Sequence, residues 1–150
     1  WELQNIGVDV EWRFAGINEN DLIVTIVKKY LGKKYPKKGI TYLGKLTERE
    51  LVSELLNSDV YVMPSHIENS PNSLYEAQIV GIPCIVTHAG GVKSILNDGN
   101  ILIQDGDPWA MAGSIASLNI KNKTVLNINK TNDKDIVINS ILNTYVDIIK

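Results

Sequence analysis

Apolar side chains recur along this chain at two periods that alternate with each other. Over residues 8–16 they fall at every second position (Val8, Val10, Trp12 and Phe14), which is the period of a β-strand with one buried face. Over residues 20–35 they fall three or four positions apart, which is the period of an amphipathic helix. Shorter segments of both kinds follow: strands are predicted at 40–44, 59–65, 82–88 and 100–104, and helices at 48–58, 71–80, 90–98 and 107–118.

Polar residues mark where two of these helices begin. Thr47, followed three residues later by Glu50, is a capping-box pattern. Asp107 is expected to be an N-cap, with Pro108 as the first helical residue. A last helix is predicted over residues 132–150, with an apolar stripe formed by Val137, Ile141, Tyr145 and Ile148.

Strands that alternate with helices at this pitch predict an α/β fold. We expect one Rossmann-like, three-layer domain over residues 1–150, with a mostly parallel sheet covered by helices on both faces. Ligands of such sheets bind beyond the carboxyl ends of the strands. The loops expected at that edge are 16–20, 44–47, 64–73, 88–91 and 104–107.

Composition narrows the class of protein. The net charge of −2 gives no basic excess of the kind that nucleic-acid binding requires, so no nucleic-acid partner is expected.

The single cysteine, Cys84, lies in an apolar run and is expected to be a small buried hydrophobe. No segment has the ~18 consecutive apolar residues of a membrane span, and the first residues do not resemble a signal peptide, so a cytoplasmic chain is expected. His66 and His88 have no cysteine or carboxylate at metal-ligand spacing, so no metal site is expected.

A basic run follows the helix predicted over residues 20–35. Lysines near the carboxyl end of a helix interact favourably with its dipole, and a solvated surface is the simpler interpretation. The alternative is peripheral contact with anionic lipid at the inner face of a membrane. The lysines of this basic run are Lys28, Lys29, Lys33, Lys34, Lys37 and Lys38.

The segment from Pro64 to Ser73 connects a strand to a helix at the ligand edge. Ser70 is expected to be the N-cap and Pro71 the first helical residue. The backbone N–H groups of the next three residues would then be free and would lie at the positive end of the helix dipole, which suits a phosphate or pyrophosphate. An ordinary capped helix without a ligand is the other interpretation.

Glu68 and Glu76 lie on either side of this helix start. Carboxylates that act as a glycosidase acid/base pair lie ~5–9.5 Å apart, whereas eight residues of helix rise ~12 Å. The spacing therefore favours two carboxylates that accept hydrogen bonds from hydroxyl groups on two parts of one elongated ligand. Each glutamate taken alone is also compatible with a solvated surface charge.

The order of motifs between residues 59 and 118 resembles the C-terminal, donor-binding half of a GT-B-fold glycosyltransferase of the group 1 (family 4) type. The residues that carry the resemblance are Pro64 and Ser65, Glu68, Glu76 and Ala77, Gly81 and Pro83, Gly90 and Gly91, and Gly106 to Pro108.

The resemblance implies transfer of a sugar, with retention of anomeric configuration, from a nucleotide donor such as a UDP- or GDP-sugar. It implies no cofactor and no metal. Glu68 matches the glutamate that contacts the donor sugar and is the candidate catalytic carboxylate, and Glu76 matches the glutamate that binds the ribose. The other donor-binding residues implied are Ser70, Asn72, Ser73 and Leu74 at the sugar and pyrophosphate, and Gly44, Lys45 and Leu46 near the base. Many members have Gly-Phe-Gly where this chain has residues 69–72, a difference that leaves the identity of the sugar open.

The resemblance also implies parts that precede this chain. In a strand order of 3-2-1-4-5-6, the first and central strand would lie upstream of residue 8, together with an Arg and a Lys that neutralise the pyrophosphate. An N-terminal domain would bind the acceptor, a glycan or lipid-linked glycan of cell-surface polysaccharide synthesis. We therefore expect a fragment of a longer glycosyltransferase that is inactive alone. A sugar-nucleotide epimerase, a phosphorylase on the same fold and a non-catalytic interaction module are the alternatives.

Overall fold

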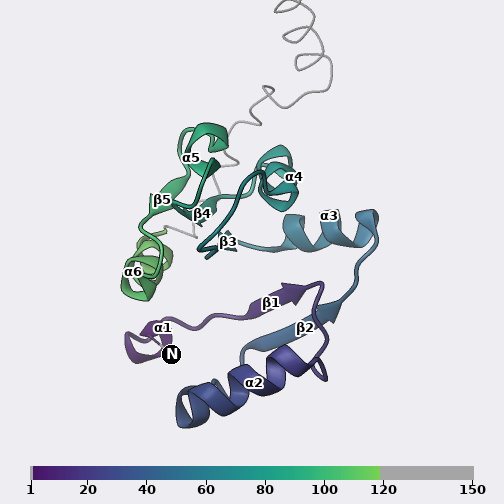
Figure 1. Ribbon diagram of the computed structural model, residues 1–150, viewed down its shortest axis with the longest axis vertical. Coiled ribbons are helices and arrows are strands. Elements are labelled where there is room, and N and C mark those ends of the chain that lie inside the picture. The colour runs from purple at the N-terminus through teal and green to yellow at the C-terminus, as the bar shows by residue number, and fades with distance from the viewer. Residues whose placement is uncertain (1, 119–150) are drawn as a thin grey trace, which may run out of the picture. The chain divides into compact units, whose positions relative to one another are not determined.

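The computed structural model describes residues 2–118, which form two compact units, each described here by itself (Figure 1). The first unit comprises residues 2–57 and 107–118, and the second comprises residues 58–106. The helix predicted over residues 132–150 lies outside the described residues. The single-domain organisation stays a prediction.

The first unit is built on two parallel strands, β1 (Trp12–Ala15) and β2 (Ile40–Gly44). Its other elements are α1 (Glu2–Asn5), α2 (Leu22–Leu31), the 3-10 turn η1 (Gly32–Lys34), α3 (Glu48–Asn57) and α6 (Pro108–Ser117). The predicted strand over 8–16 was too long: β1 begins at Trp12, opposite the first residue of β2, so the residues before it have no β2 partner for ladder hydrogen bonds.

Both predicted helix starts in this unit are confirmed. At α3, the Thr47 backbone N–H donates to Oε2 of Glu50 (2.7 Å), and the Glu50 backbone N–H donates to Oγ1 of Thr47 (3.4 Å). At α6, the Asp107 side chain accepts hydrogen bonds from the backbone N–H groups of Trp109 and Ala110. Local side-chain hydrogen bonds therefore set these two boundaries.

The second unit is a three-stranded parallel sheet with strand order β3-β4-β5. Its elements are β3 (Tyr61–Met63), α4 (Asn72–Val80), β4 (Cys84–Thr87), α5 (Val92–Ile95) and β5 (Ile101–Ile103). All four residues of the central strand β4 are buried. The largest side chains that are less than 2% exposed among the described residues belong to this unit: Leu74, Ile85, Val86, Val92 and Cys84.

The α/β class with parallel sheets is confirmed, but the described strands form two sheets where one was predicted. The pairings β1-β2 and β3-β4-β5 are those that the order 3-2-1-4-5-6 leaves when its first strand is taken away. No helix within residues 2–118 has the length and apolar character needed to cross a bilayer.

One buried polar side chain joins α4 to the segment before β5. Gln78 is 4% exposed, and its amide nitrogen donates to the carbonyl oxygen of Ile95 (3.1 Å). Its amide oxygen accepts from the backbone N–H of Asn97 (2.6 Å). Because these buried polar groups satisfy one another, the network ties α4 to the end of α5 and the segment that follows it.

We expect Cys84 to be chemically inert in the folded chain. Its side chain is buried as predicted, at 1% exposure, and burial raises the pKa of its thiol to about 12. The thiolate is the reactive form, so labelling by a thiol reagent at pH 8 should be at least ~100-fold slower in buffer than in urea. Absorbance of the released chromophore measures both rates, and equal rates would contradict the buried position of β4.

Candidate functional site

The loop that carries Glu68 leaves the carboxyl end of β3 and is attached to the end of β4. The buried hydroxyl of Thr87 lies 3.2 Å from the carbonyl oxygen of Met63 and 2.5 Å from that of Ser65, and it can donate to either. The first residues of the loop are therefore held against the central strand by a side chain that water does not reach.

Two glycines hold the middle of the same loop. Gly90 has a φ of 52°, and a Cβ atom added there would lie 1.8 Å from the carbonyl oxygen of Glu68. A Cβ atom on Gly91 would lie 3.1 Å from the carbonyl oxygen of Asn69. The close backbone approach explains why two glycines stand here: a side chain at the first position would displace the loop that presents Glu68.

The start of α4 corrects the prediction by one residue. Pro71, with φ −74° and ψ 107°, is the N-cap, so Ser70 is not the cap and lies exposed in the loop. Pro71 cannot be the first helical residue because its ψ angle is extended.

The number of free N–H groups is also corrected. The backbone N–H of Leu74 donates to the carbonyl oxygen of Pro71 (3.1 Å), so it is not free as predicted, and its side chain is fully buried. Among the described residues, the N–H groups of Asn72 and Ser73 have no hydrogen-bond acceptor, and both residues are exposed. The helix therefore offers two donors at its positive end.

The two glutamates are in different surroundings around this helix start. Glu68 is half-buried, and its Oε1 accepts a hydrogen bond from the backbone N–H of Asn69 (3.0 Å). Glu76 is exposed on α4. Between them in the chain, the hydroxyl of Ser73 accepts a hydrogen bond from the hydroxyl of Tyr61 (2.7 Å).

Tyr61 was not predicted as part of the site, although its hydroxyl interacts electrostatically with both glutamates. Burial raises the pKa of its hydroxyl, the hydrogen bond to Ser73 acts in the opposite direction, and the negative charges of Glu68 and Glu76 add to the effect of burial. The tyrosine therefore stays neutral and keeps its proton for Ser73. Its position on β3, ahead of the motif residues, gave no signal for this role.

A second pair at the same edge joins the loops after β3 and β5. Nδ1 of His66 lies 3.3 Å from Oδ2 of Asp105, whose Oδ1 accepts a hydrogen bond from the Gln104 side chain (2.9 Å). The contact with His66 is the main cause that lowers the pKa of the Asp105 carboxyl. Within residues 2–118, no group of three or more His, Cys, Asp or Glu side chains gathers as a metal centre would require.

The remaining predicted residues, Gly44, Lys45 and Leu46, belong to the first unit. The Gly44 N–H donates to the carbonyl oxygen of Ile17 (3.0 Å), and its own carbonyl accepts from the N–H of Gly16 (2.7 Å). The loops after β1 and β2 thus lie together at the carboxyl edge, as predicted. Gly44 is buried with a φ of 65°, Leu46 is partly exposed and Lys45 is exposed.

Comparison with protein families gives one match that covers most of the chain. The sequence model of the family described as Glycosyl transferases group 1 matches residues 8–135. Among solved structures, a sucrose-phosphate synthase from Thermosynechococcus elongatus superposes with a TM-score of 0.60 over 69% of this chain and 27% of its own. At 18% identity that likeness concerns the fold alone.

Curated relatives carry names of glycosyltransferases. A UDP-Gal:alpha-D-GlcNAc-diphosphoundecaprenol alpha-1,3-galactosyltransferase of Escherichia coli is 31% identical over 147 residues, 87% of this chain and 38% of that protein. A D-inositol 3-phosphate glycosyltransferase of Paenarthrobacter aurescens (strain TC1) is 35% identical over 49% of this chain and 19% of its own length. The chain thus spans well under half the length of these relatives.

The glycine contact makes a prediction about stability. We expect Gly90→Ala to lower the free energy of unfolding by at least about 2 kcal/mol, because the new Cβ would overlap the Glu68 carbonyl and the φ angle is positive. Gly113→Ala, inside α6 with no atom within 4 Å of the added Cβ, is the matched control and should raise the free energy of unfolding by about 0.5–1 kcal/mol. Urea unfolding followed by circular dichroism measures both, and a Gly90→Ala variant as stable as wild type would contradict the contact.

Proposed function

The chain belongs to the Glycosyl transferases group 1 family, and from this premise we propose that it supplies the donor half-site of a retaining glycosyltransferase. The donor proposed is a sugar activated by a nucleoside diphosphate, such as a UDP- or GDP-sugar. The chain is less than half the length of the relatives named above, so sugar transfer is proposed for the full-length protein.

The observation that supports this proposal most directly is the arrangement at the start of α4. The N–H groups of Asn72 and Ser73 lie at the positive end of the helix, with Glu68 before them in the chain and Glu76 after them. Phosphate is a good acceptor for such N–H groups, and the carboxylates are good acceptors for sugar and ribose hydroxyls. A nucleotide sugar carries all three kinds of group in one elongated molecule.

We assign the roles as the family resemblance implies them, and the chemistry of these groups is compatible with that assignment. The two N–H groups donate to the diphosphate, and their donation strengthens as the leaving group gains negative charge. Glu76 accepts from the ribose hydroxyls. Glu68 contacts the donor sugar and stabilises the positive charge that develops at its anomeric carbon. The two negatively charged glutamates would repel a diphosphate, so the site also needs positive charge. We expect this charge from the Arg and Lys that the family resemblance implies before β1.

The proposal also covers the acceptor of the sugar and the place in the cell where the transfer occurs. The Escherichia coli relative is named for a lipid-diphosphate acceptor, which supports a glycan or lipid-linked glycan acceptor for this protein, in polysaccharide synthesis at the cytoplasmic face of a membrane. The proposal includes no resident metal or cofactor, so transfer is expected to survive EDTA.

Glu76→Gln should weaken nucleotide binding. Loss of a charged acceptor of a hydrogen bond costs about 1.5–3 kcal/mol, so the Kd of UDP or GDP for the full-length protein should rise roughly 10- to 150-fold. Isothermal titration measures it. Glu48→Gln on α3, also an exposed glutamate on a helix, is the control and should leave the Kd unchanged. An unchanged Kd in Glu76→Gln would remove this residue from the site.

Glu68→Gln should separate binding from chemistry. We expect the Kd of the nucleotide to change little, because the sugar contact is absent from UDP or GDP, while kcat for sugar transfer falls at least ~100-fold. Nuclear magnetic resonance of the wild-type product tests retention of the anomeric configuration. An inverted product, or a Glu68→Gln variant with wild-type kcat, would contradict the mechanism.

A further inference from the structure

Helix α2 exposes a continuous apolar stripe. Leu22 is 73% exposed and Tyr30 88% exposed, and the other members of the stripe are Ile23, Ile26 and Val27. At 3.6 residues per turn these five side chains lie within an arc of about 140°. The buried residue of the helix, Val24, lies outside this arc. The stripe therefore faces solvent, and the other side of the helix faces its own unit.

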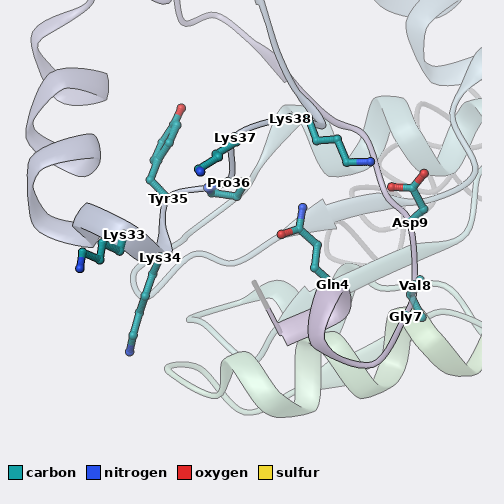
Figure 2. Close-up of a pocket in the computed structure, with 10 residues that line it drawn as sticks. All are labelled: Gln4, Gly7, Val8, Asp9, Lys33, Lys34, Tyr35, Pro36, Lys37 and Lys38. Carbon is teal, nitrogen blue, oxygen red and sulfur yellow. The ribbon is translucent and has the colours of Figure 1, made fainter.

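A basic segment follows the stripe directly. Lys29, Lys33, Lys34, Lys37 and Lys38 are all exposed. Lys28 is partly exposed and forms an ion pair with Glu19 at 3.0 Å. Figure 2 shows the lysines of residues 33–38 on one side of a hollow of about 490 Å³ and the segment from Gln4 to Asp9 on the other. Asp9 is the acidic residue among those that line it.

This surface lies at the end of the strands opposite to the predicted nucleotide edge. Gln4 to Asp9 precede β1, and Lys33 to Lys38 precede β2, so the hollow is at the amino ends of both strands. The loops of Gly16 and Gly44 are at their carboxyl ends. The donor site proposed above therefore does not use these lysines, and none of its proposed residues lies on α2.

We propose that α2 and the lysine segment bind the surface of an anionic lipid bilayer. The stripe would enter the boundary between headgroups and acyl chains, with the helix in the plane of the membrane, and the lysines would contact lipid phosphates. The ten residues of α2 are about 15 Å long, which is half of what is needed to cross the hydrocarbon core. A second copy of the chain would bring the same excess of lysines, whereas anionic headgroups complement it.

Co-sedimentation of the full chain with vesicles tests the charge requirement. The wild-type chain should bind vesicles of phosphatidylcholine and phosphatidylglycerol (3:1) at least tenfold more tightly than phosphatidylcholine alone. Substituting two of the exposed lysines, Lys33→Gln and Lys37→Gln together, should weaken binding about 30-fold, since each lysine near an anionic surface contributes about 1 kcal/mol. Arg49→Gln with Lys93→Gln removes the same charge elsewhere and should change binding less than threefold.

The stripe is tested with the same vesicles. Leu22→Ser with Tyr30→Ser should weaken binding at least tenfold, because two apolar side chains no longer enter the bilayer. Val52→Ser with Leu56→Ser, at exposed positions of α3, is the matched control and should bind like wild type. Circular dichroism confirms that each variant keeps its helices.

Four results would overturn the proposal: no binding to either vesicle, equal binding to both, equal losses in the α2 and α3 variants, or self-association through α2 that vesicles do not reverse. None of these bears on nucleotide binding, so the outcome here and the outcome for the donor site are independent.

Discussion

The loop that presents Glu68 depends on a backbone contact that tolerates no side chain. The carbonyl oxygen of Glu68 occupies the place where a Cβ atom of residue 90 would be, and the next carbonyl packs on Gly91. Thr87, at the end of the same strand, fixes the start of the loop through its hydroxyl. The end of β4 therefore determines the path of the segment between β3 and α4. Packing thus sets the path of the backbone that carries Glu68, and the carboxylate itself accepts a hydrogen bond from the backbone N–H of Asn69.

The electrostatics of the α4 start favour recognition of a ligand over acid/base chemistry between two carboxylates. The helix end contributes donors, and each glutamate contributes acceptors, so the groups complement a ligand that has phosphate and hydroxyl groups. Tyr61 joins this arrangement by donating a hydrogen bond to the Ser73 hydroxyl, and it retains its own proton because burial disfavours the phenolate. The site thus combines a rigid, partly buried support with exposed polar groups at the surface.

The first unit carries different chemistry at its two ends. At the carboxyl ends of β1 and β2, backbone hydrogen bonds join the loops of Gly16 and Gly44. At the amino ends, lysines line one side of a hollow, and they follow in the chain the helix that carries the apolar stripe. A parallel pair of strands makes this separation possible, because all of its βα loops emerge at one edge and all of its αβ loops at the other.

Local patterns in the sequence determined the order of helices and strands, the capping box at Thr47, the N-cap at Asp107, the burial of Cys84 and the place of Glu68 and Glu76 around a helix start. These features depend on side-chain period and on hydrogen bonds between near neighbours, so a single sequence can predict them. The contact of Gly90 with Glu68, the bond between Thr87 and Ser65, the pairing of His66 with Asp105 and the exposure of the α2 stripe were decided only by the tertiary structure. The three contacts join residues 22 to 39 positions apart, and the exposure of the stripe depends on which face of α2 packs against its unit. The division of the strands into two sheets was likewise decided only by the tertiary structure. Strand pairing depends on which partner strand is present and not on the pattern within each strand.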